Sequence, residues 1–590
     1  MIFVHCLMKV GVVGLVTFLY YRVFVWNTVF AIFMIPLFCY LVSGFARTVV
    51  STLFYIFSKP VILDEDEKII ASGIPREVTL VFFRPIFAKT FPEIENMLNS
   101  MKQDIINSQQ PAKNLKFVVI DNTRDEEVKR KTRETIIKMQ EEFGSDVVFY
   151  FHRNIKVDFF KKVGIFFDAV LFLYEGATKP KVYISEKWSQ LTKGLRNPQE
   201  PLWDIILGNI GVLGIRGTID DVLKGKDVDV DADKRMQFCF VSDADNVWPG
   251  GEVKKLVAKM IHPENKEITI YQPSIELSNP DENPFIKMNY LAREMDRYES
   301  ITKWRLYRFS PFYGKGAMNV KNYVEQVIKT EWLNPAKAAS HDFQEALKGE
   351  TVFVEDVHIL EKTFSNKIAE LKRVALWQWG DLETVRQFVF RKFSPGRKSH
   401  LLTLLRLLIS DTLFNLWLIA TVVGLTVVGL AEIANPKLFW CLFIGIVLVQ
   451  MVVPTFVMPL VNGYKDKKYS VRPKRPLKVF GIVSGLKQVT FGVLVGNLNL
   501  IYQPKSFVEN LIRQLKNRPF VWTTAAMAEQ DTAKMSLIDI YKALWLSTAI
   551  GIIMLVLVIA GVPSVIGTIF LLPYMLSFLI GPFLIKISSK

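Results

Sequence analysis

The chain has 590 residues, of which 50% are apolar, and its mean hydropathy is +0.23. It is too long for one compact domain and too apolar for a disordered chain or an ordinary soluble enzyme. Its 73 Lys and Arg residues exceed its 57 Asp and Glu residues by 16, which suits a nucleic acid, an anionic membrane surface or a polyanionic substrate. Its four cysteines are widely spaced and mostly lie in apolar runs. This pattern argues against a disulfide framework or a zinc site and predicts a chain that faces a reducing compartment.

The beginning of the chain is mostly apolar. Residues 2–57 contain few charged side chains and are long enough for two transmembrane helices of about 20 residues each. A cleaved signal peptide would be shorter and would end in a small-residue cleavage site. We therefore expect two transmembrane helices within residues 1–60.

A polar stretch at 61–400 follows and has the right size for one large domain. In it, β-branched and aromatic runs alternate with helical patterns, at 78–83, 93–109, 116–120, 125–143, 147–151 and 237–241. This alternation predicts an α/β domain with a mostly parallel sheet, in which ligands bind at the carboxyl ends of the strands.

The sharpest chemical feature of this stretch is a pair of carboxylates, Asp243 and Asp245, directly after the apolar run 238–241. Alternation along an extended segment points both side chains to one side, where they can share a divalent cation. Mg²⁺ and Mn²⁺ take carboxylate oxygens together with those of a diphosphate, so this strand end is a candidate metal and nucleotide site. A capped strand end without a ligand is the structural alternative.

Asp121 ends the run 117–121 at the corresponding edge of the sheet. There it can accept hydrogen bonds from a base or a ribose. Alternatively it only shapes the turn, because Asn122 or Thr123 followed by Glu126 resembles a capping box.

Further along, the segment Ser340-His-Asp-Phe343 opens an amphipathic helix. Asp342, near the helix start, is a candidate general base for an acceptor hydroxyl, or only an acidic residue that complements the helix dipole. His341 is either a metal ligand or a packed core histidine. Later, Trp377 and Trp379 present aromatic faces that suit sugar rings, whereas interfacial tryptophans would instead anchor a helix in the membrane.

Residues 401–590 are again mostly apolar and contain paired runs at 401–431, 438–461, 543–562 and 564–585. The run 479–501 is diluted by polar residues and predicts an interfacial helix, with a seventh span as the alternative. Lys and Arg in short loops tend to stay on the cytoplasmic side. Six spans with an interfacial helix keep every basic cluster, the central domain and both termini in the cytoplasm.

In their order and spacing, these segments resemble the membrane-embedded inverting family 2 glycosyltransferases. The likeness is greatest to the glucosyltransferase of osmoregulated periplasmic glucans and to the glycosyltransferase domain of cyclic β-1,2-glucan synthase, and more distant to cellulose synthase. The resemblance implies an α/β glycosyltransferase-A domain, which is Rossmann-like and cytoplasmic, inserted between α-helical transmembrane blocks. It covers roughly residues 80–151, 214–386 and the apolar blocks on either side.

The resemblance also implies roles for individual residues. Asp121 and Asp243 would bind the nucleotide sugar, Asp243 and Asp245 would hold Mg²⁺ or Mn²⁺, and Asp342 would be the catalytic base. The implied acceptor-binding residues are Gly314, Gly316, Gln272, His341, Trp377 and Trp379. The segment near 519–531 is similar to the gating loop of cellulose synthases.

Three features depart from the family. The Gln-x-x-Arg-Trp signature falls on Arg373-Val-Ala-Leu-Trp377, which lacks the glutamine and the arginine that helps to hold the pyrophosphate; Lys372 or Arg373 is a candidate substitute. The Lys-x-Gly-Asn stretch is only approximated around Arg216 and Gly217, the nucleotide-sugar contacts expected there. The segment 155–213 is an insertion without a counterpart, and its Phe-rich opening predicts an interfacial amphipathic helix.

We therefore expect a processive inverting membrane glucosyltransferase that transfers glucose from UDP-glucose to a growing β-glucan, with a β-1,2 linkage as one candidate, and couples synthesis to export. Its partners would be UDP-glucose, the glucan acceptor and the lipid bilayer. Nucleic acid is not expected, because the positive charge gathers beside the membrane segments. The alternatives are transfer of one sugar to a lipid or other acceptor, and a catalytically degenerate scaffold subunit.

Overall fold

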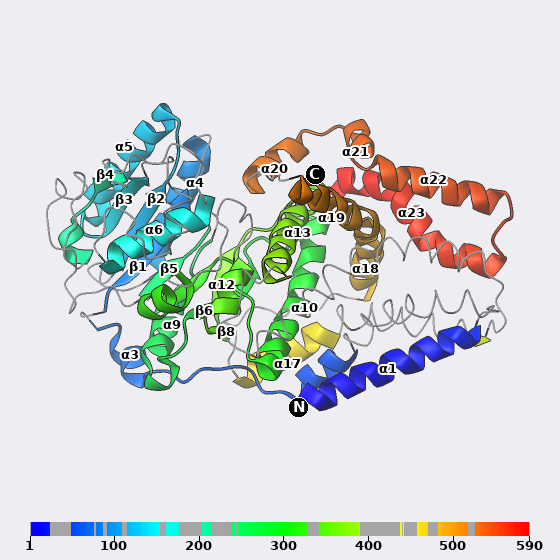
Figure 1. The fold of residues 1–590 in the computed structure, drawn as a ribbon, viewed down its shortest axis with the longest axis horizontal. Coiled ribbons are helices and arrows are strands. Elements are labelled where there is room, and N and C mark those ends of the chain that lie inside the picture. Colours follow the sequence, from blue (N-terminus) through cyan, green and yellow to red (C-terminus); the bar gives the residue numbers. More distant parts are fainter. Residues whose placement is uncertain are drawn as a thin grey trace.

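A computed structural model of the chain describes residues 2–23, 49–75, 78–86, 91–108, 115–153, 161–175, 203–213, 238–243, 246–328, 342–389, 437–438, 441, 453, 457–469, 482–516, 518 and 525–588. These residues form an α/β part, built on one sheet, and a helical part beside it (Figure 1). The long helices α10 (Pro284–Tyr307) and α13 (Lys367–Val389) lie between the sheet and the apolar helices of the helical part (Figure 1).

The described strands form one mixed sheet in the order β4-β3-β2-β1-β5-β7-β6-β8. They are β1 (Leu80–Ile86), β2 (Leu115–Asp121), β3 (Val148–Arg153), β4 (Trp203–Leu207), β5 (Phe238–Val241), β6 (Ile270–Leu277), β7 (Gly316–Asn319) and β8 (Thr351–Glu361). β1 is parallel to β2 and β5, β2 to β3, and β6 to β8, whereas β4 and β7 run antiparallel to their neighbours. The predicted α/β class is confirmed.

Helices surround the sheet and continue into the helical part. Those of the α/β part are α3 (Glu67–Ser72), α4 (Phe91–Asn107), α5 (Glu126–Phe143), α6 (Lys161–Glu175), α9 (Glu252–Ile261), α11 (Val320–Tyr323) and α12 (Asp342–Lys348), with the short turns η2 (Ile210–Leu213), η4 (Pro263–Asn265) and η5 (Val324–Ile328). The helical part adds α1 (Ile2–Val23), a helix at 49–57, α17 (Met458–Tyr469), α18 (Ile482–Gly496), α19 (Asn499–Leu515), α20 (Ala525–Ala533), α21 (Leu537–Ala543), α22 (Trp545–Ile559) and α23 (Val565–Ser588).

Both faces of the sheet are covered because its central strands are apolar on both sides. Alternate residues of β1 point in opposite directions. Val81 and Phe83 pack on the face that α6 covers, and Phe82 packs on the face covered by α4, α5 and α9. Phe82 stacks between Phe117 of β2 and Phe240 of β5, with ring centroids 4.5 Å apart in each pair. This stack fixes the register of the strands on which the site is built.

The segment expected to be an insertion contributes to this core. Phe166, Phe167 and Phe172 of α6 are buried against the sheet, so the prediction of an interfacial helix there is wrong. A helix that is apolar around most of its circumference packs inside a protein rather than along a surface. Downstream, β4 adds an antiparallel edge strand beside β3.

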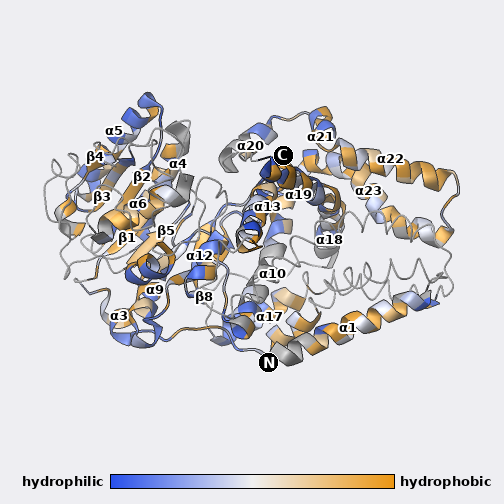
Figure 2. Ribbon diagram, viewed as in Figure 1, coloured by the Kyte–Doolittle hydropathy of each residue, from blue (hydrophilic) through white to orange (hydrophobic). Residues whose placement is uncertain are grey.

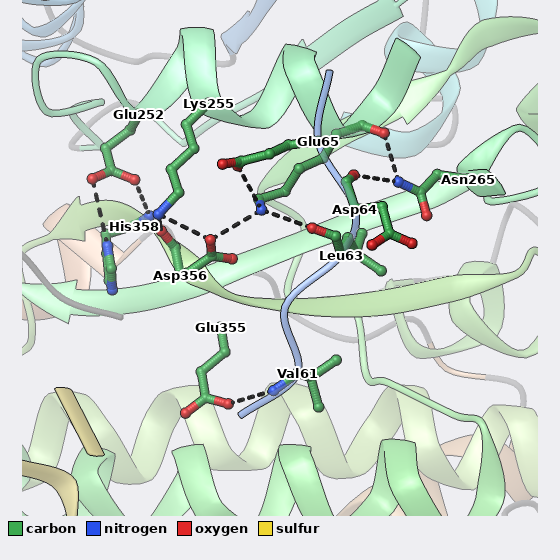
Figure 3. Close-up of polar contacts among 11 residues, drawn as sticks. Val61, Leu63, Asp64, Glu65, Glu252, Lys255, Asn265, Glu355, Asp356 and His358 are labelled. Atoms are coloured by element: carbon green, nitrogen blue, oxygen red, sulfur yellow. Dashed lines mark hydrogen bonds and ion pairs between the residues drawn. The ribbon is translucent and has the colours of Figure 1, made fainter. Parts of the chain in front are cut away.

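A strap at residues 59–66 ties the helical part to the sheet (Figure 3). The fully buried Lys259 of α9 donates to the carbonyl of Leu63 at 3.1 Å and lies 3.0 Å from carboxylate oxygens of both Glu65 and Asp356. Nearby, the backbone N–H of Val61 donates to Glu355 at 3.0 Å. Buried charges have to be paired, so this network holds the strap on α9 and β8.

Among the described residues, one helix, Gly567–Ser588 within α23, is long and apolar enough to cross a membrane. α21 and α22 pass the same test together but are bent by 83°, and α1 contains a shorter apolar helix, Leu7–Leu19. Figure 2 shows apolar residues along α1, α22 and α23. Residues 24–48 and 401–436, on which further spans were predicted, lie outside the described residues.

The run 479–501, predicted to be interfacial, contains α18. This helix packs along α23 and α10, and the side chain of Asn497 just after it donates to Ser577 of α23 at 3.1 Å. α19 follows and packs against α13, with Gln514 donating to the carbonyl of Trp379 at 3.1 Å.

Candidate functional site

The carboxyl ends of the parallel strands meet at one edge of the sheet. Ile86 at the end of β1 is in register with Asp121 of β2, and Asp121 with His152 of β3. From β1 the chain adds β2, β3 and β4 on one side, and it then returns to place β5 on the other side of β1. The strand order therefore reverses between β1 and β5. In α/β sheets, ligands bind outside the carboxyl ends of the strands at such a switch point.

The loop after β5 is clamped at this switch point. The backbone N–H of Asp243 donates to the side-chain oxygen of Asn246 at 2.7 Å, and Arg84 of β1 donates to the carbonyls of both residues at 2.7 and 3.2 Å. Ser100 of α4 donates to the carbonyl of Asn246 at 2.6 Å. The Asp243 side chain remains 34% exposed, so the held backbone of Asp243 presents its carboxylate at the edge.

A buried ion pair between Arg84 and Asp104 of α4 lies beneath this loop. Both side chains are 1% exposed, and the other oxygen of Asp104 accepts the backbone N–H of Trp248 at 2.7 Å. Burial raises the pKa of Asp104 to about 6, although the charge of Arg84 acts in the opposite direction. The pair joins β1, α4 and the loop in one polar network.

Lys315, just before β7, reaches the same edge. Its ammonium nitrogen lies 3.3 Å from Oδ2 of Asp243 and 2.9 Å from Oε2 of Glu361, the last residue of β8. The side chains of Lys315 and Glu361 are only 2% and 3% exposed. An ammonium is thus fixed between two carboxylates that come from different strands.

Gly314 brings Asp342 to the same turn. Its φ of +72° is in the left-handed region, and a Cβ placed on it would lie 2.8 Å from Oδ1 and 2.9 Å from Oδ2 of Asp342. Asp342 is the first described residue of α12, in the segment where the sequence predicts that a helix opens. Val241 of β5 is in register with Gly316 of β7, so Asp243 leaves β5 beside the Gly314-Lys315 turn, against which Asp342 also rests.

The expected acceptor loop is held from below by β6. The buried side chain of Gln272 accepts the backbone N–H of Tyr313 at 2.9 Å and donates to the carbonyl of Pro273 at 2.8 Å. A Cβ on Gly316 would lie 2.4 Å from the carbonyl oxygen of Tyr271. Gln272 and Gly316 therefore fix the loop that carries Gly314 and Lys315.

α13 brings an arginine and an aromatic ring next to this turn. The guanidinium of Arg373 lies 5.0 Å from the ring centroid of Trp377 and 3.8 Å from Oε1 of Glu361. Trp377 is exposed, whereas Trp379 is buried and its carbonyl accepts a hydrogen bond from Gln514 of α19. Lys372 points elsewhere, 3.8 Å from Asp531 of α20.

Asp121 lies at the edge but is fully buried. Its Oδ1 accepts the backbone N–H of Thr123 at 2.7 Å, and its Oδ2 accepts the hydroxyl of Tyr150 at 2.7 Å. Burial and the Asp121 charge raise the pKa of Tyr150, which keeps the phenol protonated as a donor. This geometry matches the turn-shaping alternative, and the contact of Asp121 with a nucleotide stays a prediction. The capping box is wrong, because α5 is capped by Asp125.

His152 continues this polar network. Its ring nitrogens lie 2.6 Å from Asp204 of β4 and 2.8 Å from the carbonyl of Thr123. Burial lowers the pKa of His152, but the hydrogen bond to Asp204 and the nearby Asp121 charge outweigh it, so the pKa is raised overall. β4 therefore supplies a side chain that supports the turn after β2.

The structure thus brings Asp243, Asp342, Gly314, Gly316 and Gln272 to one turn, and Trp377 is linked to them through Arg373 and Glu361. Arg216, Gly217, Asp245 and His341 lie outside the described residues. The sequence analysis missed Lys315 and Glu361. Glu361 carried the same signal as Asp121, a carboxylate that directly ends a β-branched run.

The residue types at this turn indicate a chemistry. An exposed carboxylate beside a fixed ammonium group suits a ligand that carries phosphate groups and a bound divalent metal ion. A second carboxylate on the same turn suits proton transfer. An exposed indole suits the face of a sugar ring.

The sequence was compared with family models and with curated proteins, and neither comparison found a match.

Proposed function

We propose that the protein is a membrane-embedded inverting glycosyltransferase of the glycosyltransferase-A type, which transfers glucose from UDP-glucose to a growing β-glucan. The observation that carries this proposal is the approach of Asp243 and Asp342 to the single turn Gly314-Lys315 at the switch point of the sheet. In this proposal, Asp243 would face the donor diphosphate and Asp342 would face the acceptor. The order of the sequence motifs supports the same assignment.

Asp342 would act as the general base. The acceptor hydroxyl oxygen attacks C1 of glucose while the bond from C1 to the β-phosphate oxygen breaks, and UDP leaves with the electron pair. The hydroxyl proton passes to the Asp342 carboxylate. Attack opposite to the leaving group inverts the anomeric configuration and gives a β-linkage from an α-linked donor. Trp377 would stack on the acceptor sugar.

Asp243 offers the type of donor atom that a hard cation prefers, an exposed carboxylate oxygen. Asp245 is the expected second ligand. No group of three ligating side chains occurs in the part of the chain that the structure describes, so the donor diphosphate would complete the coordination. A bound Mg²⁺ or Mn²⁺ would neutralise the charge on the departing UDP.

Embedding in the bilayer is supported by exposed apolar side chains on the helical part. On α22, Ile553, Val556 and Ile559 are 58%, 57% and 76% exposed. Contiguous apolar surface of this kind marks a membrane or protein contact. We propose a multi-pass protein with the α/β part and both termini in the cytoplasm, whose helices guide the growing polymer across the membrane.

The test is transfer by the purified protein in detergent or nanodiscs. Radiolabelled nucleotide sugars with Mg²⁺ or Mn²⁺ should give a polymer from UDP-glucose, and methylation analysis would give its linkage. Asp342→Asn should still bind UDP but lose transfer by about 10²-fold or more. A lipid-linked monosaccharide as the product would replace the polymer proposal. Equal behaviour of wild type and Asp342→Asn in every assay would refute catalysis at this site.

A further inference from the structure

We propose that Lys315 is a positioning residue of the donor site, whose buried ammonium holds the Asp243 carboxylate and makes the approach of a nucleotide diphosphate to it favourable. This inference rests on the proposed function and concerns a residue of the acceptor loop to which the sequence motifs assign no role. Its basis is the row of alternating charges Asp243, Lys315, Glu361 and Arg373 across the edge of the sheet.

The first step is the placement of the ammonium. Asp243 projects from the loop after β5 and is one-third exposed, whereas Lys315 behind it is 2% exposed. A carboxylate alone would repel an incoming diphosphate. A cation 3.3 Å from its Oδ2 offsets that repulsion, and the effect is strong where water is excluded.

The second step is the role of Glu361. This carboxylate is 3% exposed and lies 2.9 Å from the Lys315 nitrogen, so it holds the ammonium in place when a ligand draws on Asp243. Its other oxygen lies 3.8 Å from Arg373, which is 27% exposed. That distance is too long for a hydrogen bond, so this ion pair does not occupy the N–H donors of the guanidinium.

The third step links donor and acceptor. Gly314 precedes Lys315 and touches the Asp342 carboxylate. A displacement of Lys315 would therefore move the turn against which Asp342 rests. Loss of Lys315 should impair both the binding of the diphosphate and the transfer step.

Three variants separate position from net charge. Asp243, Lys315 and Glu361 together carry a charge of −1 − 1 + 1 = −1. Lys315→Met makes this −2, Glu361→Gln makes it 0, and the double variant Lys315→Met/Glu361→Gln leaves it at −1. Removing both members of a buried ion pair is far less disruptive than removing one, so the double variant should fold even if Lys315→Met does not.

The readout is the binding of UDP compared with that of uridine, measured by calorimetry without divalent metal and again with Mn²⁺. We expect the double variant to bind UDP about tenfold more weakly than wild type, with uridine binding unchanged. Lys315→Met should be weaker still, and Glu361→Gln should bind UDP as tightly as wild type or more tightly. Lys116→Met is the control, because Lys116 is as buried as Lys315 but lies at the start of β2, at the opposite end of the strands from this turn. This variant should leave the UDP-to-uridine ratio unchanged.

The outcomes are distinguishable. A stable double variant that binds UDP like wild type and transfers glucose at the wild-type rate would overturn the role of Lys315. If the double variant bound uridine and UDP more weakly by the same factor, the role of Lys315 would also be overturned, because Lys315 would then not act on the diphosphate. If wild type itself binds neither UDP nor UDP-glucose, the proposed function fails rather than this inference.

Discussion

Substituting Gly314 with alanine tests the close approach of Asp342 to the turn. An L-residue with a φ of +72° in the left-handed region costs roughly 1–2 kcal/mol of stability. The new Cβ would lie 2.8 Å from Oδ1 of Asp342, and ordinary contacts begin at 3.4 Å, so the carboxylate must move by at least 3.4 − 2.8 = 0.6 Å. Misplacement of a reacting group by 1 Å can cost about 10²-fold in rate. We therefore expect kcat for glucose transfer to fall about tenfold.

Gly251→Ala is the matched control. Gly251 also has a left-handed backbone, with a φ of +85°, but a Cβ there has nothing within 4 Å. Thermal unfolding should show a similar loss of stability in both variants, whereas only Gly314→Ala should lose transfer activity. If Gly314→Ala lost stability like the control and kept the wild-type kcat, Asp342 would not be a base held against this turn.

Two further predictions concern stability. Lys259→Met leaves the carboxylate of Asp356, which is 4% exposed, with only the partly exposed Lys255 as an ion-pair partner. The fold should lose about 2–3 kcal/mol of stability in chemical denaturation, and a loss below 1 kcal/mol would contradict the bracing role of the strap. The pKa of His152 is raised in the folded protein above its usual value of 6.5. The stability that His152 contributes is therefore fully present below pH 6.5 and is lost as pH rises through its pKa in the folded protein. Burial alone would raise the pKa of its partner Asp204, but the hydrogen bond to His152 outweighs burial and lowers that pKa overall. The stability that Asp204 contributes is therefore lost as pH falls through its pKa in the folded protein. Unfolding temperature should decline above pH 6.5 in wild type and decline less in His152→Gln; equal slopes would contradict the pairing.

The strands that carry the site could be predicted because their signal is local. The runs at 78–83, 116–120, 147–151 and 237–241 are β-branched and aromatic, and each falls on a strand of the structure. The helix that opens near Asp342 was predictable for the same reason. The prediction that the carboxyl ends of these strands meet at one edge of the sheet followed from the alternation of strands and helices, which is typical of parallel pairing.

The partners of the site residues could not be predicted in this way. Lys315 and Glu361 meet only because β7 runs antiparallel between β5 and β6, and no sequence spacing fixes that order. Asp104 stands in the buried stripe of α4, three residues after Met101, where an apolar side chain is expected, and the tertiary ion pair with Arg84 accounts for a carboxylate there. α6 was misread because an apolar segment next to membrane-like sequence suits either a bilayer surface or a protein core.

The most direct test is a cryo-electron microscopy structure of the protein with UDP and Mn²⁺ bound. The account predicts density for the diphosphate beside Asp243 and Lys315, with a space between it and Asp342 that accepts a sugar. Density for UDP elsewhere in the molecule, or an empty edge under conditions in which calorimetry shows saturation, would contradict it.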